Sequence, residues 1–260
     1  MCLILFAWRS HRSHRLVVAA NRDEWFRRPA QTARFWTDAP AVLAGRDAVH
    51  GGTWLGVTRS GRFAALTNYR EPQRYDPAAP SRGALVSDFL RGTMSAAAYT
   101  EQLHRSTQHY NGYSLVACDG ATMYCVSNRG RAPVALDAGV YGLSNHLLDT
   151  PWPKVVRGKS RLAALAEQDD VADALFALLY DRKPAADEAL PDTGLGVERE
   201  RALSSSHILL GPREDWTAVY GTRCATVVTL GARRLAYEER TFTPAARIDC
   251  IAAESFTLAA

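Results

Sequence analysis

A cysteine at position 2, directly after Met1, is the residue of this sequence with the clearest capacity for chemistry. If Met1 is removed, Cys2 becomes the terminal residue and carries both a thiol and a free α-amine. A terminal amine titrates at about pH 8, so it can accept a proton close to neutrality, which a lysine amine cannot. A thiol beside such a base can attack a carbonyl carbon. The alternative is that Cys2 is a small apolar residue opening a buried strand.

The first two apolar segments of the chain predict what lies next to this cysteine. Residues 2–8 are apolar throughout, and residues 15–20 are apolar after Arg15; neither segment alternates, so both strands are expected to be buried on two faces. The polar residues 9–14 between them can close a hairpin. In a hairpin the beginning of the first strand lies beside the end of the second, so Cys2 is expected beside whatever follows residue 20.

Four polar residues follow the second segment: Asn21, Arg22, Asp23 and Glu24. Because side chains alternate along a strand, Asn21 and Asp23 share one face and Arg22 takes the other. We therefore expect Cys2 to lie beside Asn21 and Asp23, where the carboxylate could hold the terminal ammonium or orient a thiolate. The alternative is a turn with solvated side chains, because Asn and Asp favour turns.

Three further polar residues carry groups suited to chemistry, and two of them, Asn68 and Arg223, stand where a strand is expected to end or begin. Asn68 in TNYR and Asn145 in GLSNHLLDTPWPK each carry an amide that can donate to a developing oxyanion. Removal of such a donor costs about 3–4 kcal/mol of transition-state stabilisation. Arg223 begins a strand and can offer its planar guanidinium to an anionic or carbonyl group. Each residue alone is a weak indication, since asparagine is common at strand ends.

Aromatic residues near these positions can line an apolar acyl or porphyrin pocket, although most of them are expected in the ordinary core. They are Trp25, Phe26, Trp36, Trp54 and Tyr69. The residues predicted to contact a substrate are Asn21, Arg22, Glu24, Trp54 and Tyr69.

The composition excludes several classes of protein. The chain has 260 residues, ordinary hydrophobic content and a formal charge of +4 from scattered arginines, so nucleic-acid binding is not indicated. Five cysteines with no CxxC indicate neither a zinc site nor a redox pair, and free thiols favour a reducing compartment. The apolar residues 2–8 have no preceding basic region and no small-residue cleavage site, and no segment approaches the length of a membrane span. We expect a cytoplasmic protein.

The order of elements predicts a layered α+β protein with a mostly antiparallel sheet, in a single domain over residues 1–260. Further hairpins are expected at 53–58 with 62–67 and at 114–119 with 121–128. Helices are expected from Ser81 to about Arg91, from Ser95 to about His109, and over 154–167 and 169–181, the third beginning near Pro153. A long loop at 183–203 is followed by strands at 204–210, 224–230 and 234–242.

Five sequence blocks occur in a fixed order along nearly the whole chain. They are AANRDEWFRRP, GGTWLGV, ALTNYREP, GLSNHLLDTPWPKV and AVYGTRCATVV. Together they resemble the signature segments of the NRDE family, also called the transport-and-Golgi-organisation family. That family in turn resembles the cysteine branch of the N-terminal-nucleophile hydrolases, which includes bile-salt hydrolases and penicillin V acylases.

The resemblance implies a four-layer αββα sandwich of two antiparallel sheets between helical layers. It also implies roles for five residues. Cys2 would be the nucleophile and Asp23 would hold its amine, while Asn68 and Asn145 would occupy oxyanion or substrate-amide positions. Arg223 would be the distal arginine.

One departure from the acylase pattern bears on the thiol. The acylases carry an arginine three residues before the aspartate, and this chain has Ala20 there. Arg22 is expected on the opposite face, so the thiol should be less activated. Retention of Met1 would also block the amine.

Two functions remain open at this point. The first is an N-terminal-cysteine amidohydrolase or acyltransferase acting on a linear amide or acyl donor, with no cofactor and no metal. The second is a non-catalytic haem or acyl-lipid binding and trafficking protein on the same fold. For haem, His11 and His14 fall in a predicted polar turn, and His104 and His109 lie about 140° apart on a predicted helix, so neither pair forms an evident ligand set. The ligand and the oligomeric state are not indicated.

Overall fold

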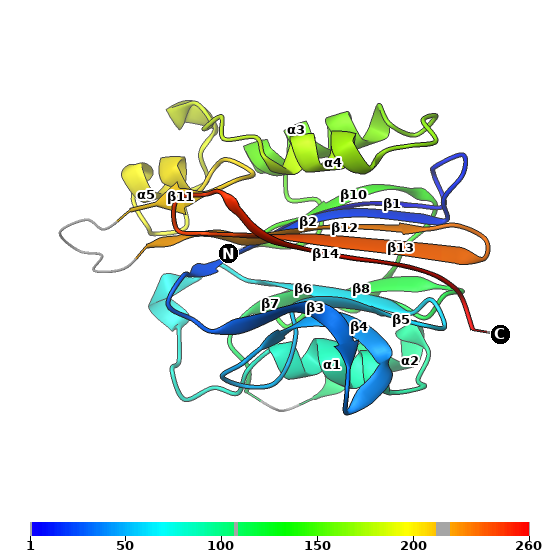
Figure 1. The fold of residues 1–260 in the computed structure, drawn as a ribbon. Coiled ribbons are helices and arrows are strands. Elements are labelled where there is room, and N and C mark those ends of the chain that lie inside the picture. The colour runs from blue at the N-terminus through cyan, green and yellow to red at the C-terminus, as the bar shows by residue number, and fades with distance from the viewer. Residues whose placement is uncertain (1, 107–108, 212–218, 260) are drawn as a thin grey trace.

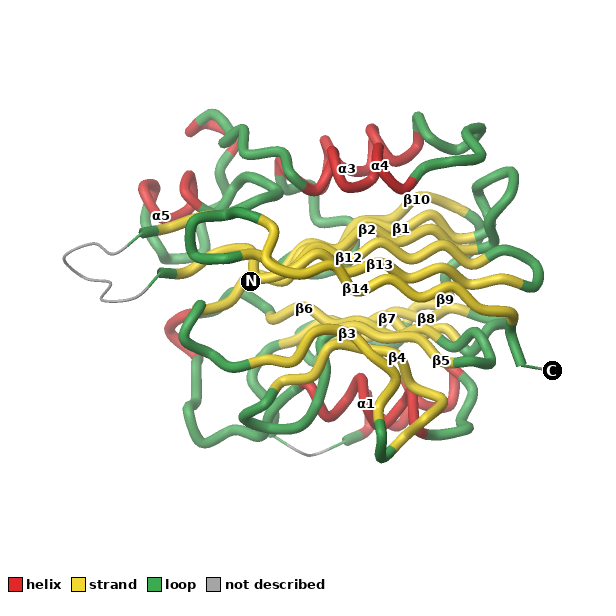
Figure 2. Tube along the Cα trace, viewed as in Figure 1, coloured by secondary structure: helices red, strands yellow, loops and turns green. Residues whose placement is uncertain are grey.

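The computed structural model describes residues 2–106, 109–211 and 219–259. Two antiparallel sheets lie face to face, and helices cover the outer face of each (Figures 1 and 2). The predicted four-layer αββα arrangement is therefore confirmed. The first sheet runs in the spatial order β10 (Gly139–Leu143), β1 (Cys2–Trp8), β2 (Leu16–Trp25), β12 (Tyr220–Leu230), β13 (Arg234–Phe242) and β14 (Ile248–Thr257), with β11 (Leu209–Leu210) paired to β12.

The second sheet and the helices complete the layers. The second sheet runs in the order β3 (Ala30–Trp36), β4 (Ala39–Asp47), β5 (Leu55–Thr58), β6 (Phe63–Asn68), β7 (Tyr113–Cys118), β8 (Met123–Ser127) and β9 (Val134–Ala135). The helices are α1 (Gly83–Arg91), α2 (Ala96–Arg105), α3 (Pro153–Ala163), α4 (Ala172–Leu179) and α5 (Val197–Ala202), with 3-10 turns η1 (Pro72–Arg74) and η2 (Asp187–Ala189). Figure 1 shows α3 and α4 over the first sheet and α1 and α2 over the second.

The apolar runs in β1 and β2 have a direct structural cause. Ile4 and Phe6 belong to the core between the two sheets, whereas Leu3 and Leu5 belong to the core between the first sheet and helices α3 and α4. A strand covered on both faces has no solvent side, so its sequence shows no alternation of apolar and polar residues.

Helix α3 packs very closely on β1 and β10 because a glycine lies at each contact, Gly158 in the helix and Gly142 in β10. A Cβ added to Gly158 would come within 2.4 Å of Leu5 Cδ1, and one added to Gly142 would come within 2.6 Å of Val155 Cγ1. The close approach fixes the first turn of α3, which carries Lys154, above the start of β1.

Several predicted element bounds are wrong. Helix α1 is capped at Arg82 without a side-chain hydrogen bond, not at Ser81. The Ser95 cap of α2 is confirmed by its hydrogen bond from the Ala98 N–H, but α2 ends at Arg105, so His109 is not on this helix. Of the strand expected at 204–210, only Leu209–Leu210 forms, because the serines before it hydrogen-bond with loop backbone instead.

Some helices and strands of the structure were not predicted from the sequence. Helix α5 lies inside the predicted loop 183–203, and β3, β4, β10 and β14 were not expected. Strand β14 is almost entirely exposed, so it lacks the apolar face by which a strand is recognised. Within the three described stretches, no helix has the length and hydrophobicity that crossing a membrane requires.

Candidate active site

Cys2 is the first residue of β1, and its cross-strand neighbour in β2 is Arg22. Residues directly opposite each other in an antiparallel pair point to the same face. The thiol therefore shares the inter-sheet face with Arg22 and Ala20, whereas Asn21 and Asp23 point to the helix-covered face. The expectation that Cys2 shares a face with Asn21 and Asp23, opposite Arg22, is wrong because the hairpin register is one residue different.

Arg22 is buried and is held by three groups at the end of the sandwich. Its guanidinium lies 3.6 Å from Asp47 Oδ2 and 3.9 Å from Glu24 Oε2. The guanidinium also lies over the Trp54 ring, 4.2 Å from the ring centroid. A guanidinium fixed in this way presents a permanent positive charge beside the thiol.

A small cavity adjoins the Cys2 side chain on the inter-sheet face. Its volume is about 10 Å³, which is room for about one water. Its lining comprises Cys2, Ile4, Ala20, Asn21, Arg22, Trp54, Leu55, Leu66 and Thr226. An acyl chain or a porphyrin needs far more room, so either ligand requires the site to open.

The pKa of the Cys2 thiol is raised above its ordinary value. Burial is the largest cause, and the negative charge of Asp23 acts in the same direction. A hydrogen bond from the Asp23 backbone and the positive charge of Arg22 oppose the shift. The thiol thus needs a base to ionise near neutrality, and the Asp23 main-chain hydrogen bond and the charge of Arg22 are among the influences that favour its ionised form.

Asp23 is buried on the face of β2 that is covered by helices. Its Oδ1 accepts a hydrogen bond of 2.7 Å from the Thr222 hydroxyl, and its main-chain carbonyl accepts one of 3.0 Å from the Tyr220 hydroxyl. Burial raises the pKa of the Asp23 carboxyl, while the charges of Lys154 and Arg70 and the Thr222 hydrogen bond lower it. The carboxyl is therefore placed to hold a cation at the beginning of β1, although the Cys2 side chain points the other way.

Lys154, Arg70 and Glu200 surround Asp23 on the same buried face. Lys154 donates to the Leu203 carbonyl at 3.2 Å, and Arg70 pairs with Glu200 while lying 4.6 Å from the Trp152 ring centroid. Burial lowers the pKa of Lys154 to about 8, against the opposing influence of Asp23. Two carboxylates and two cations thus form one buried cluster behind the nucleophile.

Asn145 and Ser144 connect the nucleophile to the second sheet. The Ser144 hydroxyl lies 3.1 Å from the Cys2 main-chain oxygen and 3.4 Å from Asn145 Oδ1. Asn145 is completely buried and donates from Nδ2 to the Asn68 carbonyl at 3.0 Å. The structure therefore brings the Asn145 side chain to the Asn68 main chain and links Asn145 to the Cys2 main chain through Ser144. Among the described residues, the second amide hydrogen of Asn145 has no hydrogen-bond acceptor.

Two of the predicted substrate contacts serve the protein itself. Asn21 is buried and donates to the carbonyls of Leu179 and Ser206, both at 2.8 Å, so it ties β2 to the end of α4. Glu24 accepts from the Trp25 N–H at 2.9 Å and faces Arg22. Asn21 therefore anchors the backbone, and Glu24 neutralises an arginine.

Tyr69 and Trp54 take different positions around the site. The Tyr69 hydroxyl hydrogen-bonds with His146 Nε2, and the Nδ1 of that histidine lies 2.9 Å from the Thr150 hydroxyl. This relay follows Asn68 and Asn145 directly in the chain. Trp54 lines the cavity and packs against the backbone of Gly45, where a Cβ would lie 2.5 Å from its ring.

Arg223 occupies a register shift in β12, between Thr222 and Cys224. Such an extra residue re-aims a side chain. Its Nη1 lies within 3.1 Å of the carbonyls of Trp25, Phe26 and Arg28. In this arrangement Arg223 closes the turn after β2, and its guanidinium is committed to backbone carbonyls.

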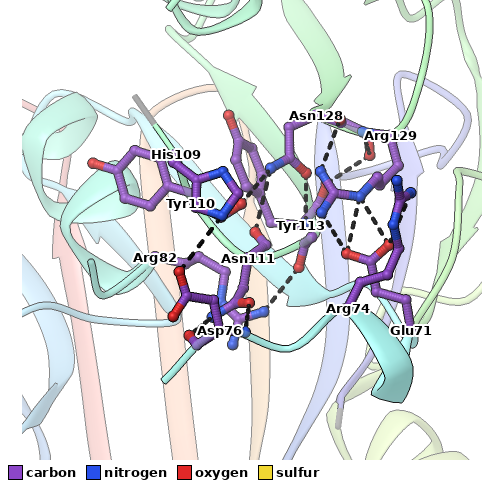
Figure 3. Close-up of polar contacts among 12 residues, drawn as sticks. Glu71, Arg74, Asp76, Arg82, His109, Tyr110, Asn111, Tyr113, Asn128 and Arg129 are labelled. Atoms are coloured by element: carbon purple, nitrogen blue, oxygen red, sulfur yellow. Dashed lines mark hydrogen bonds and ion pairs between the residues drawn. The ribbon is translucent and has the colours of Figure 1, made fainter. Parts of the chain in front are cut away.

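The segment after Tyr69 is fixed by a network of polar contacts (Figure 3). Glu71 accepts from Arg129, and Asp76 exchanges hydrogen bonds with Asn111. Arg82 donates to the Gly112 carbonyl at 2.8 Å, and its pKa is lowered mainly by burial, with Cys2 among the groups that oppose the shift. The network therefore holds a second arginine within electrostatic reach of the thiol.

The four histidines considered as haem ligands, His11, His14, His104 and His109, do not lie beside Cys2. His11 and His14 lie in the turn that joins β1 to β2, at the far end of β1 from Cys2. A strand of this length spans about 20 Å, too far for one porphyrin iron to contact both ends. His104 and His109 belong to the other helical layer and the loop after it. Together with the one-water cavity, these positions do not fit a haem in this conformation.

Several residues of the site were not predicted from the sequence. Arg70 and Lys154 lie in two of the five sequence blocks, ALTNYREP and GLSNHLLDTPWPKV. Lys154 also interrupts the otherwise apolar buried face of α3, which is a recognisable signal for a buried charge. Ser144 also lies in GLSNHLLDTPWPKV, but a neutral residue gives no buried-charge signal. Glu200 lies outside the five blocks, and its partner Arg70 is distant in sequence.

Comparison with solved structures identifies the fold. The crystal structure of the mutant C2A conjugated bile acid hydrolase from Clostridium perfringens matches 99% of this chain and 96% of its own, with a TM-score of 0.51 and 11% sequence identity. The two proteins therefore share the fold of the N-terminal-nucleophile hydrolases.

Comparison of sequences identifies the family. The chain is 38% identical over 250 residues to the Transport and Golgi organization protein 2 homolog of Bos taurus and 36% identical to that of Mus musculus, covering 89% of this chain and of each relative. The family model "Transport and Golgi organisation 2" matches residues 1–244. Since the ordered blocks, the fold and these relatives agree, the chain belongs to the Transport and Golgi organisation 2 family.

Proposed function

We propose that this protein, once Met1 is removed, is an N-terminal-cysteine acyl transfer enzyme that cleaves a linear amide or another acyl donor. The observation that carries the proposal is the position of Cys2 at the start of β1, with Arg22 across from it, Asp23 behind it and Asn145 linked to it through Ser144. The related bile acid hydrolase was solved as a C2A mutant, so that protein also has a cysteine at position 2.

The proposed reaction begins with proton transfer within one residue. The α-amine of Cys2 takes the thiol proton, and the sulfur attacks the carbonyl carbon to form an S–C bond and an oxyanion. The oxyanion collapses, the bond to the leaving amine breaks, and the α-ammonium returns its proton to that amine. Water then gives a proton to the α-amine and attacks the thioester, which releases a carboxylic acid and restores the thiol.

The surrounding residues have assigned parts in this proposal. Arg22 stabilises the thiolate, and Asp23 orients the α-ammonium. Asn145, whose second amide hydrogen has no acceptor in the described part of the chain, and Asn68 stabilise the oxyanion. Tyr69 and Trp54 are the substrate contacts that remain from those predicted. The acyl group enters only after Trp54 or its neighbours move, because the existing cavity admits about one water.

We place this activity in the cytoplasm. All five cysteines, Cys2, Cys118, Cys125, Cys224 and Cys250, are free thiols. Free thiols persist in a reducing compartment.

The test starts with the intact mass of the purified protein, which reports whether residue 1 or residue 2 is the terminus. The processed protein is then treated with a panel of acyl thioesters and activated amides, and the acyl adduct is located by peptide mass spectrometry. Because Cys250 is exposed, the experiment uses a Cys250→Ser background. An adduct on Cys2 that forms and then hydrolyses is the expected result.

Cys2→Ser and Asp23→Asn are the informative variants, and Asp173→Asn on the exposed face of α4 is the matched control. Processed protein that forms no adduct with any donor contradicts the enzyme. Binding of haem in the same preparation, seen as a Soret shift, would then favour the carrier function.

A further inference from the structure

Lys154 is a charged side chain in a place that opposes its charge. It is the second residue of α3, and its side chain is buried. A cation in the first turn of a helix faces the positive end of the helix dipole, and burial adds a desolvation cost. Something at this position must compensate both effects.

The compensation comes from two carboxylates on neighbouring elements. The charged groups that act on Lys154 are Asp23 of β2, Glu200 of α5, Arg70 after β6 and Cys2 of β1. Glu200 is already paired with Arg70 and accepts from Thr193. Asp23 is the larger of the two carboxylate influences on Lys154, and Lys154 is the first of the side chains that stabilise the ionised Asp23.

The Lys154 ammonium makes few hydrogen bonds, so its charge can stabilise the Asp23 carboxylate. Among the described residues its ammonium donates one hydrogen bond, to the Leu203 carbonyl. The close packing of Gly158 on Leu5 holds the start of α3 against β1, so the ammonium cannot withdraw to solvent. Asp23 therefore already has Lys154 as a resident cation before the terminal amine of Cys2 is considered.

We propose that Lys154 is a positioning residue that shares the Asp23 carboxylate with the terminal amine of Cys2 and keeps that amine unprotonated. A carboxylate alone would stabilise the protonated amine and remove the base. A second, permanently buried cation at the same carboxylate repels the proton from the amine, so the amine remains a base near neutrality. This inference rests on the proposed function for its purpose, but it concerns the amine alone and is testable without any acyl donor.

The experiment measures the titration of the terminal amine in a Cys2→Ala background. This change keeps a small second residue, so Met1 can still be removed, and it eliminates the thiol that would capture the reagent. The rate of reductive methylation of the amine, followed by mass spectrometry as a function of pH, gives its pKa. Adding Lys154→Met should raise that pKa by about one unit, so methylation at pH 6.5 should slow about tenfold.

Two comparisons separate the charge effect from a structural one. Lys154→Arg keeps the charge and should restore the amine pKa. Lys159→Met on the same helix removes a half-exposed lysine that pairs with Asp149, and it should leave the amine pKa unchanged. Equal amine pKa values in the parent and the folded Lys154→Met protein would overturn the proposal.

A measurement on the unsubstituted chain covers the case in which Lys154→Met does not fold. Carbon-13 NMR of ε-labelled lysines should show Lys154 titrating in two steps, because its protonation and that of the amine compete for one carboxylate. A single-step titration overturns the inference. If the amine depends on Lys154 but no acyl adduct forms on Cys2, the proposed function fails while this inference stands.

Discussion

Arg22 lies directly across from Cys2 in the antiparallel pair of β1 and β2, on the same face of the sheet. The acylases that the sequence resembles carry an arginine at the position where this chain has Ala20. Because the next residue on the same face of β2 is Arg22, a guanidinium still stands beside the sulfur. Ala20 instead lines the cavity.

The position of Arg22 predicts its effect on thiol reactivity. Arg22→Ala should slow alkylation of Cys2 by iodoacetamide several-fold at pH 7.5, because loss of the positive charge raises the thiol pKa. The measurement is the rate of Cys2 modification in the Cys250→Ser background. Arg27→Ala, at an exposed site in the following turn, is the control and should be unchanged. Equal alkylation rates in the two variants would show that Arg22 does not activate the Cys2 thiol.

Asn145 should contribute more to acyl transfer than Ser144 does. Asn145→Ala is expected to slow Cys2 acylation by about 10²–10³-fold, since it removes an oxyanion donor. Ser144→Ala removes a hydrogen bond to the Cys2 carbonyl and should cost about 1 kcal/mol of stability with a much smaller effect on rate. Single-turnover acylation rates and urea denaturation distinguish the two. If Ser144→Ala slowed Cys2 acylation and Asn145→Ala did not, Ser144 and not Asn145 would be the oxyanion donor.

His207 should make the protein sensitive to mild acid. It is 3% exposed and lies edge-on to Tyr180 and Phe242, and its ring nitrogens make no hydrogen bond within the described residues. Burial, followed by the charge of Arg182, lowers its pKa to about 4.

The sign of the effect follows from proton uptake. Between about pH 6.5 and pH 4, His207 is protonated in the unfolded chain but neutral in the folded protein. The free energy of unfolding therefore falls by about 1.4 kcal/mol for each pH unit of acidification within this window. Above pH 6.5 the residue has no effect. Urea denaturation at pH 7.0 and 5.0 should show a smaller loss for His207→Phe than for the parent, whereas exposed His50→Gln should behave as the parent. Equal losses in all three would contradict the prediction.

Gly158→Ala should destabilise the protein even though alanine is the better helix former. A helix-interior change of glycine to alanine normally adds up to about 1 kcal/mol of stability. Here the new methyl group would lie 2.4 Å from Leu5 Cδ1, so a net loss of about 1–3 kcal/mol is expected from overpacking. Thermal denaturation measures it. Gly211→Ala, which has nothing within 4 Å of its Cβ, should change stability by less than about 0.5 kcal/mol. A stabilised Gly158→Ala protein would mean that α3 can move away from β1.

The sequence predicts the central part of this fold well and its edges poorly. Strands β1, β2 and β12 are covered on both faces, so their unbroken apolar runs identify them. Strand β14 and the short β9 are largely exposed, and helix α5 is a six-residue turn of charged residues, so none has a periodic apolar face.

Some contacts of the candidate site could likewise be predicted from the sequence, and others could not. The proximity of Cys2 to Asp23 could be predicted, because a hairpin brings them together. The meeting of Asn68 with Asn145 followed only from the family resemblance, because β10, which ends just before Asn145, was not expected. The face of Arg22 could not be predicted, since it depends on a one-residue register that the turn at residues 9–14 sets. The pairing of Arg70 with Glu200 spans 130 residues of sequence and needs the tertiary fold.

The volume beside the sulfur also bears on the fate of an acyl group bound there. A thioester on Cys2 can be resolved by water or by an incoming amine, and the adjoining space admits only the smaller of these nucleophiles. Because the site must open before an acyl group can enter, the extent of that opening sets the partition between release of a free acid and transfer to an acceptor. Enlarging that space at Leu66 or Leu55 would be the route to shift the product ratio toward aminolysis.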